Sequence, residues 1–269
     1  MSDTGLFSKS FFINDEEPPE QIIYLIHDLF LSHKFFESFI HDYSVTTSKS
    51  IQFIVIDLPG HGYDNGPRGH MENFEEALKG LAKVICETDS PQSVKSRSVI
   101  SFGCSLVFSL ACSVRNHLGV NNLIDHLIAI DPMVTIPSRN KQGSQILDFL
   151  KSQKFFLKFL KQKRKIELRN EKKDILNLDE LSFLYINEFN RMSNFLRSRS
   201  YFIDSAVYFI FSNEFKKNEL DLVLLFYKSI GSDIKERDFI DLSENSFQEF
   251  CKKIQNFIDG KIENAKNNG

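Results

Sequence analysis

The chain has 269 residues, of which 42% are hydrophobic and 26% charged, and its formal net charge is -3. This length suits one large domain or a domain with an insertion, and the composition is typical of a globular protein. A net charge so close to neutrality argues against a chain-wide nucleic-acid-binding surface, so we expect no nucleic-acid partner.

The N-terminal segment and the cysteines indicate a cytoplasmic protein. Residues 1–17 lack the basic and apolar regions of a signal peptide, and no apolar run approaches the roughly 20 residues that span a bilayer. The four cysteines show neither metal-ligand nor C-x-x-C spacing, as is typical of free thiols in a reducing compartment. We therefore expect a cytoplasmic location, no metal and no cofactor.

Short apolar runs that end in polar or turn residues predict the strands of a buried sheet. These runs are 22–26, 53–56, 99–102, 127–130, 206–211 and, more weakly, 238–242. Helical patterns lie between and after them, at 71–86, 105–114, 220–227 and 247–258. This alternation predicts an α/β fold with a mostly parallel central sheet and helices on both faces. Ligand sites in such sheets lie beyond the C-terminal strand ends.

Residues 134–200 interrupt the alternation, because they hold no strand signal and at least two helical patterns. We interpret them as a helical cap insertion between two parts of the core, 1–133 and 201–269. Within the cap, 151–173 carries ten Lys or Arg and two Glu. This segment is either a cap helix with a solvated basic side or, over 149–173, an amphipathic helix on an anionic membrane surface, which would make the protein peripheral there.

The polar residues at the predicted strand ends resemble a known family. His27-x-Leu29, D-L-P-G-H-G at 57–62, G-C-S-L at 103–106 and I-D-P at 130–132 follow one another as in the α/β-hydrolase fold. Residues 57–78 resemble the monoacylglycerol lipase, lysophospholipase and serine-aminopeptidase-like (S33-type) group more narrowly. Members of that group carry a G-H-G-x-S-x-G-P-R-G-H run before a helix. The resemblance implies a carboxylic-ester hydrolase that acts on a small acyl ester or lipid.

The resemblance also implies the roles of individual residues. Ser105 takes the nucleophile position on a strand-to-helix turn, although Val107 stands where the G-x-S-x-G motif has its second glycine. The backbone N–H groups of Leu29 and Leu106 would form the oxyanion hole. Glu214 is the candidate for the acid that orients the base.

The base itself is absent from its expected place after the last strand, since none of the seven histidines lies beyond His126. His27 and His70 are the candidate substitutes. Asp28 stands where the family has glycine and places a carboxylate where negative charge must develop. We therefore expect ester hydrolysis that is impaired or lost. Two alternatives stay open: a hydrolase with a relocated base, and a non-catalytic pseudo-hydrolase that binds a lipid or a protein.

Overall fold

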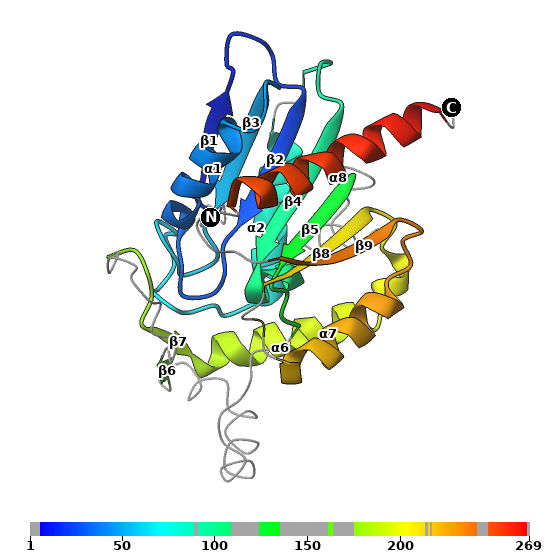
Figure 1. Cartoon of the computed structure of the whole chain (residues 1–269). Coiled ribbons are helices and arrows are strands. Elements are labelled where there is room, and N and C mark those ends of the chain that lie inside the picture. Colours follow the sequence, from blue (N-terminus) through cyan, green and yellow to red (C-terminus); the bar gives the residue numbers. More distant parts are fainter. Residues whose placement is uncertain are drawn as a thin grey trace.

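A seven-stranded sheet forms the centre of the molecule, in the order β1-β3-β2-β4-β5-β8-β9 (Figure 1). The computed structural model describes residues 6–88, 91–108, 124–134, 161–163, 175–212, 215, 217–240 and 247–267. The strands are β1 (Ser8–Ile13), β2 (Gln21–Ile26), β3 (Ile51–Ile56), β4 (Ser96–Phe102), β5 (His126–Ile130), β8 (Ala206–Ser212) and β9 (Lys235–Ile240). Neighbouring strands are parallel except for β1, which pairs with β3 in the antiparallel sense. The predicted mostly parallel sheet is thus confirmed.

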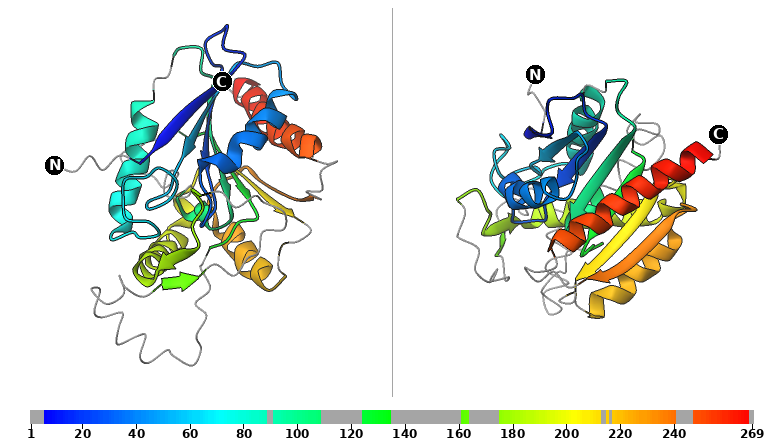
Figure 2. Two further views of the ribbon diagram at one scale, coloured as in Figure 1. Left: turned by 90° about the vertical axis from the view of Figure 1, so that its left-hand side faces the viewer. Right: turned by 45° about the horizontal axis from the view of Figure 1, so that its top comes forward.

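Helices cover both faces of this sheet (Figures 1 and 2). One face carries α1 (Phe36–Ser44) and α8 (Phe247–Asn267). The other carries α2 (Phe74–Glu87), α6 (Phe183–Arg197) and α7 (Lys217–Ser229). Successive side chains of a strand point to opposite faces, so β2 sends Ile23 to the first core and Tyr24 to the second. Burial on both faces explains the continuous apolar run of this strand.

The C-terminal ends of the central strands meet at one edge of the sheet. Ile26 of β2 lies opposite Ile56 of β3, and Phe102 of β4 lies opposite Ile130 of β5. The residues that follow these strands are therefore neighbours, although they are far apart in the sequence. This edge is where the fold class places its ligand sites.

The predicted cap, 134–200, is described at 134, 161–163 and 175–200. It contains α6 and, contrary to the expectation of no strand, an antiparallel pair of β6 (Lys161–Lys163) and β7 (Glu180–Ser182). Strands of three residues are too short for a periodic pattern to reveal. The basic segment 149–173 lies outside the described residues apart from β6.

Among the described parts of the chain, no helix combines the length and the apolar character needed to cross a membrane.

Candidate active site at the strand ends

The turn after β4 has a glycine at its tip. Phe102 is extended (φ -117°, ψ 135°), Gly103 is left-handed (φ +57°), and Leu106 is already helical (φ -45°, ψ -38°). A short 3-10 turn, η2 (Gly103–Ser105), joins the strand to the helical residues 106–108. A left-handed residue between a strand and a helix marks the strained point of such a turn. Gly103 therefore occupies the tip, two residues before Ser105.

Ser105 is fully buried, and its hydroxyl is used within the turn. Its Oγ accepts the N–H of Phe102 at 2.9 Å, donates to the Phe102 carbonyl at 2.6 Å and lies 3.0 Å from the Ile26 carbonyl. The structure therefore places the hydroxyl of Ser105, the predicted nucleophile position, inside the turn. Small residues, Ser101 and Ser105, flank the tip as the two glycines of G-x-S-x-G flank its serine. Val107 lies outside the turn, buried in the core.

Two backbone N–H groups converge on the carboxylate of Asp28. The nitrogens of Leu29 and Cys104 each lie 2.8 Å from Asp28 Oδ1. Leu106, the other predicted donor, instead directs its N–H to the carbonyls of Gly103 and Cys104. Two converging backbone N–H groups can bind a negatively charged oxygen. Here an oxygen atom of the protein itself occupies that point.

Asp28 and Gly103 fit each other closely. A Cβ atom built on Gly103 would overlap the carboxylate of Asp28. The carboxylate therefore fills the space in which a side chain at the tip would begin. A left-handed backbone at position 103 disfavours other residues as well. The absence of a side chain at the tip and the presence of Asp28 thus depend on each other.

The two candidate substitute bases contact neighbouring loops. His27 is fully buried, with Nδ1 2.8 Å from the Asp28 carbonyl oxygen and Nε2 3.1 Å from the Leu58 nitrogen and 3.3 Å from Asp57 Oδ1. His70 lies with Nδ1 2.9 Å from Ser182 Oγ, at the start of α6. These contacts give both rings a structural role in holding the strand-end loops together.

A buried network surrounds Asp57, the residue that follows β3. Its carboxylate accepts the N–H groups of His33 at 2.7 Å and Tyr63 at 2.9 Å, and His33 Nδ1 lies 2.8 Å away. Burial raises the pKa of Asp57, but the hydrogen bond and charge of His27 and the backbone N–H donors outweigh it and hold the pKa well below its usual range. Asp57 is therefore ionised and fixes the loop that carries the G-H-G run.

His61 of this run is a neutral, buried histidine. Burial lowers the pKa of His61 to about 3, and the nearby charge of His27 adds to the effect. Its Nδ1 donates to the Pro59 carbonyl at 2.8 Å, and its Nε2 accepts the Phe30 N–H at 3.3 Å. His61, the histidine of the G-H-G run, therefore positions the loop after β2, which carries Asp28.

The predicted acid, Glu214, lies outside the described residues. A different carboxylate, Asp131, links the ends of β5 and β8. Its Oδ1 accepts the Ser212 N–H at 2.6 Å and its Oδ2 accepts the Ser212 hydroxyl at 2.7 Å. Sequence reasoning placed Asp131 at a strand end but assigned it no role, although its position directly after a strand was the available signal.

Tyr185 connects α6 to the strand ends and was missed by sequence reasoning. It is fully buried, and its ring lies edge-on to His61 with centroids 5.6 Å apart. Its hydroxyl has no hydrogen-bond partner within the part of the chain that the structure describes. Burial raises the pKa of Tyr185, and the charges of Cys104, Asp64 and Asp28 raise it further. The first turn of α6 thus lies over the strand-end turns.

Comparison with known proteins identifies the fold. No protein-family model and no curated protein sequence matches the chain. The structure is similar to the monoacylglycerol lipase of Paleococcus ferrophilus (15% identity, TM-score 0.71), over 93% of this chain and 96% of that one. It is also similar to a soluble variant of the monoglyceride lipase of Saccharomyces cerevisiae in complex with a substrate analog (14%, TM-score 0.73; 94% and 91%). A third similar structure is Est1E from Butyrivibrio proteoclasticus with ferulic acid bound (12%, TM-score 0.62; 95% and 96%).

These similarities confirm the fold predicted from the strand-end motifs. The chain has the α/β-hydrolase fold, and the neighbours include lipases and a protein with ferulic acid bound. At these identities the likeness establishes the fold, while activity has to be argued from the site itself.

Proposed function

From the α/β-hydrolase fold and the glycine at the tip of its β4 turn, we propose that the chain is a non-catalytic pseudo-hydrolase. It binds a small acyl or lipid ligand and does not hydrolyse esters by serine chemistry. The observation that carries this proposal is the carboxylate of Asp28, which accepts the N–H groups of Leu29 and Cys104 above Gly103.

Ester hydrolysis in this fold needs a nucleophile, a base and an empty oxyanion hole, and three features of the chain argue against them. Gly103 offers no side chain, and the sequence holds no histidine after His126. A carboxylate in the hole opposes the negative charge that develops on the substrate oxygen. Loss of triad members typically lowers kcat by about 10⁴ to 10⁶, so turnover should be negligible.

The competing function is a hydrolase that uses Ser105 with His27 or His70 as a relocated base. Ser105 would have to give up its bonds to Phe102 and Ile26 and move from a fully buried position to the cleft. Cys104 is no better placed, because its thiol is buried beside Met133, with the two sulfur atoms 4.0 Å apart. The geometry therefore favours the non-catalytic function.

A fluorophosphonate probe separates the two functions. We expect neither labelling of the native protein nor turnover of nitrophenyl butyrate. Labelling that disappears in Ser105→Ala but persists in the matched variant Ser101→Ala would overturn the proposal. Circular dichroism and a melting curve should accompany each variant, because the Ser105 hydroxyl also stabilises the turn.

The ligand-binding part of the proposal has its own test. The support is that related folds carry a substrate analog or ferulic acid. A monoacylglycerol ether, which no esterase can cleave, should bind saturably to the native protein in a calorimetric titration. Failure of both the ether and the corresponding ester to bind would reject the binding function while leaving the absence of hydrolysis intact.

A cytoplasmic location and contact with anionic membranes through 149–173 belong to the same proposal. The membrane contact is supported by the ten basic and two acidic residues of 151–173. Co-sedimentation with vesicles that contain phosphatidylserine should weaken as salt is raised, because charge attraction is screened. Binding that is insensitive to salt would contradict the electrostatic contact.

A further inference from the structure

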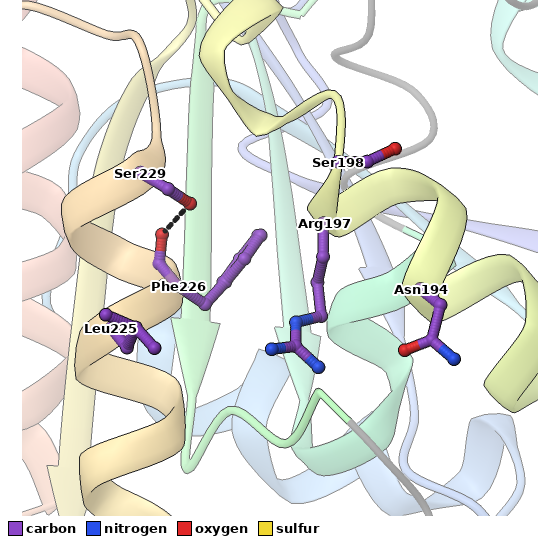
Figure 3. A pocket seen from close by; sticks show the side chains of 6 residues that line it. All are labelled: Asn194, Arg197, Ser198, Leu225, Phe226 and Ser229. Carbon is purple, nitrogen blue, oxygen red and sulfur yellow. Dashed lines mark hydrogen bonds between the residues drawn. The ribbon is translucent and has the colours of Figure 1, made fainter.

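A pocket of about 440 Å³ lies between the C-terminal halves of α6 and α7 (Figure 3). Helix α6 and its cap contribute Asn194, Arg197 and Ser198. Helix α7 contributes Leu225, Phe226 and Ser229. The side chain of Arg197 extends into the space between the two helices, as Figure 3 shows. The volume falls in the range of small-molecule sites.

Arg197 is the cation of this pocket and has no partner in the described part of the chain. Two other arginines of the same helix end are engaged: Arg191 pairs with Glu188 at 2.8 Å, and the Arg199 guanidinium lies 4.5 Å from the centre of the Phe195 ring. None of the described residues that line the pocket is acidic. A half-buried guanidinium without an anion is a group that a ligand can satisfy.

The carbonyl groups at the C-terminal end of α6 do not need the guanidinium of Arg197 as a hydrogen-bond donor. A basic residue in the last turn often serves free carbonyl groups there. In α6, however, each of the last four carbonyls already accepts a hydrogen bond from another group. The pairs are Ser198 N–H to Asn194, Ser198 Oγ to Phe195, Arg199 N–H to Leu196 and Ser200 Oγ to Arg197. The guanidinium is therefore available to a ligand rather than to the helix.

The walls of the pocket define the ligand further. The amide of Asn194, three residues before Arg197, has no hydrogen-bond partner among the described residues and adds a donor on the same side of the helix. Opposite them lie the buried ring of Phe226 and Leu225, an apolar side chain that is 63% exposed. One fixed cation, a polar donor and an apolar wall suit a monoanion with an apolar body.

We propose that this pocket binds a carboxylate with a short apolar chain. The guanidinium fork of Arg197 pairs with the two carboxylate oxygens, Asn194 donates to one of them, and the chain lies against Leu225 and Phe226. A phosphate dianion fits less well, because Arg197 is the single cation among the lining residues that the structure describes.

The pocket is separate from the strand-end turns. The chain leaves α6 at Arg197 and enters β8 at Ala206, and it leaves α7 at Ser229 and enters β9 at Lys235. The ends of both helices therefore lie toward the amino ends of these parallel strands. Gly103 follows the carboxyl end of β4, at the opposite edge of the sheet. The proposal is independent of whether the strand-end site hydrolyses esters.

Calorimetric titration with hexanoate tests the proposal. We expect saturable binding to the native protein and at least about tenfold weaker binding to Arg197→Gln, since a charge-assisted pair contributes roughly tenfold or more in affinity. Arg199→Gln is the matched control: it removes the same charge two residues away, outside the pocket, and should bind as the native protein does. Equal affinity in Arg197→Gln, or equal loss in Arg199→Gln, would overturn the site.

Two further titrations define the ligand class. Leu225→Ser should weaken hexanoate binding but leave acetate binding unchanged, and its exposed position makes a folding defect unexpected. Methyl hexanoate, which lacks the charge, should bind at least about tenfold more weakly than hexanoate. The absence of saturable hexanoate binding at millimolar concentration, equally tight methyl ester binding, or displacement of hexanoate by equimolar inorganic phosphate would each reject the carboxylate assignment.

Discussion

Position 103, at the tip of the turn after β4, is occupied by glycine. Its backbone is left-handed, and the carboxylate of Asp28 occupies the space next to its Cα. Elsewhere in the same loops, Asp57 holds a similar position over Gly62, whose added Cβ would overlap that carboxylate. Both carboxylates thus use the room that a glycine leaves to reach backbone N–H donors.

The contact between Asp28 and Gly103 predicts non-additive stability changes. Gly103→Ser should lower the free energy of unfolding by about 2 kcal/mol, because its Cβ meets the carboxylate in a strained conformation. Combined with Asp28→Gly, the same change should cost less, because the overlap is gone. Urea unfolding of the two single variants and the double variant measures the coupling. Simple additivity would contradict the close fit.

His61 predicts how stability depends on pH. Its pKa is about 3 in the folded chain, against about 6.5 when exposed, so the unfolded state binds more protons between these values. Stability should therefore fall as the pH drops below about 6.5, by up to roughly 1.4 kcal/mol per pH unit. Below about pH 4, Asp57 acts in the same direction, because its folded pKa also lies below the unfolded value.

Urea unfolding between about pH 7 and pH 4.5 tests this slope. His61→Gln should flatten the slope, since Gln does not titrate. The exposed His41 provides a control, because His41→Gln should leave the slope as in the native protein. An equally steep slope in His61→Gln would show that another group carries the dependence.

At the scale of elements, Ser182 joins α6 to the loop after β3. Its Oγ accepts the Tyr185 N–H at 3.1 Å as the N-cap of the helix and also lies 2.9 Å from His70 Nδ1. Asn73 is an N-cap without such a second link to a loop, and its Oδ1 accepts the Glu75 N–H at 2.8 Å. Ser182 therefore positions α6 over the strand ends, in addition to starting the helix.

Replacement of the two N-caps by alanine separates these roles. Asn73→Ala should lower the free energy of unfolding by about 1 kcal/mol, the usual effect of a lost cap. Ser182→Ala should cost about 2 kcal/mol, because a buried partner of His70 is lost as well. Thermal or urea unfolding measures both, and equal losses would show that the contact with His70 contributes nothing.

The elements that could be predicted are those with strong local patterns. Strands β2, β4, β5 and β8 are buried on both faces and appear as continuous apolar runs. Strand β1 escaped prediction because only Ile13 of its six residues is buried. The tip of the β4 turn was placed two residues late, because the letters Gly-x-Ser matched the motif while the strand ends at Phe102.

At the scale of the whole molecule, the two cores differ in composition. The core under α1 and α8 contains a cluster of edge-on aromatic rings in which Phe39 contacts Phe53, Phe102, Phe247 and Phe250. Edge-to-face rings add to the stabilisation that burial alone provides. The ring contacts of Phe39 therefore add to the stability of this face of the sheet.

Phe250→Ala tests how much the aromatic cluster contributes to the free energy of unfolding. Phe250 is fully buried, so its truncation should lower the free energy of unfolding by about 3–5 kcal/mol. Phe12→Ala, on the edge strand β1 and 54% exposed, should change it by less than about 0.5 kcal/mol. Urea unfolding measures both, and similar values would show that the aromatic cluster is not a principal source of stability.

The functional features of the chain divide into those that are visible in the sequence and those that depend on contacts between distant residues. A missing histidine after position 126 is visible in the sequence whatever the alignment. The position of the Asp28 carboxylate is not visible, because it depends on a contact between two strand-end loops that are distant in the sequence. That Arg197 has no partner among the described residues is likewise a property of how two helices lie side by side.

The close fit between Asp28 and Gly103 also determines what single mutations at these two positions can achieve. A serine at position 103 meets the carboxylate and is penalised, whereas loss of the carboxylate alone opens an anion site without a nucleophile beside it. Each single step lacks a catalytic benefit, and the missing histidine adds a third requirement. Under the proposed non-catalytic function, a single mutation at either position would therefore not restore serine chemistry at this edge of the sheet.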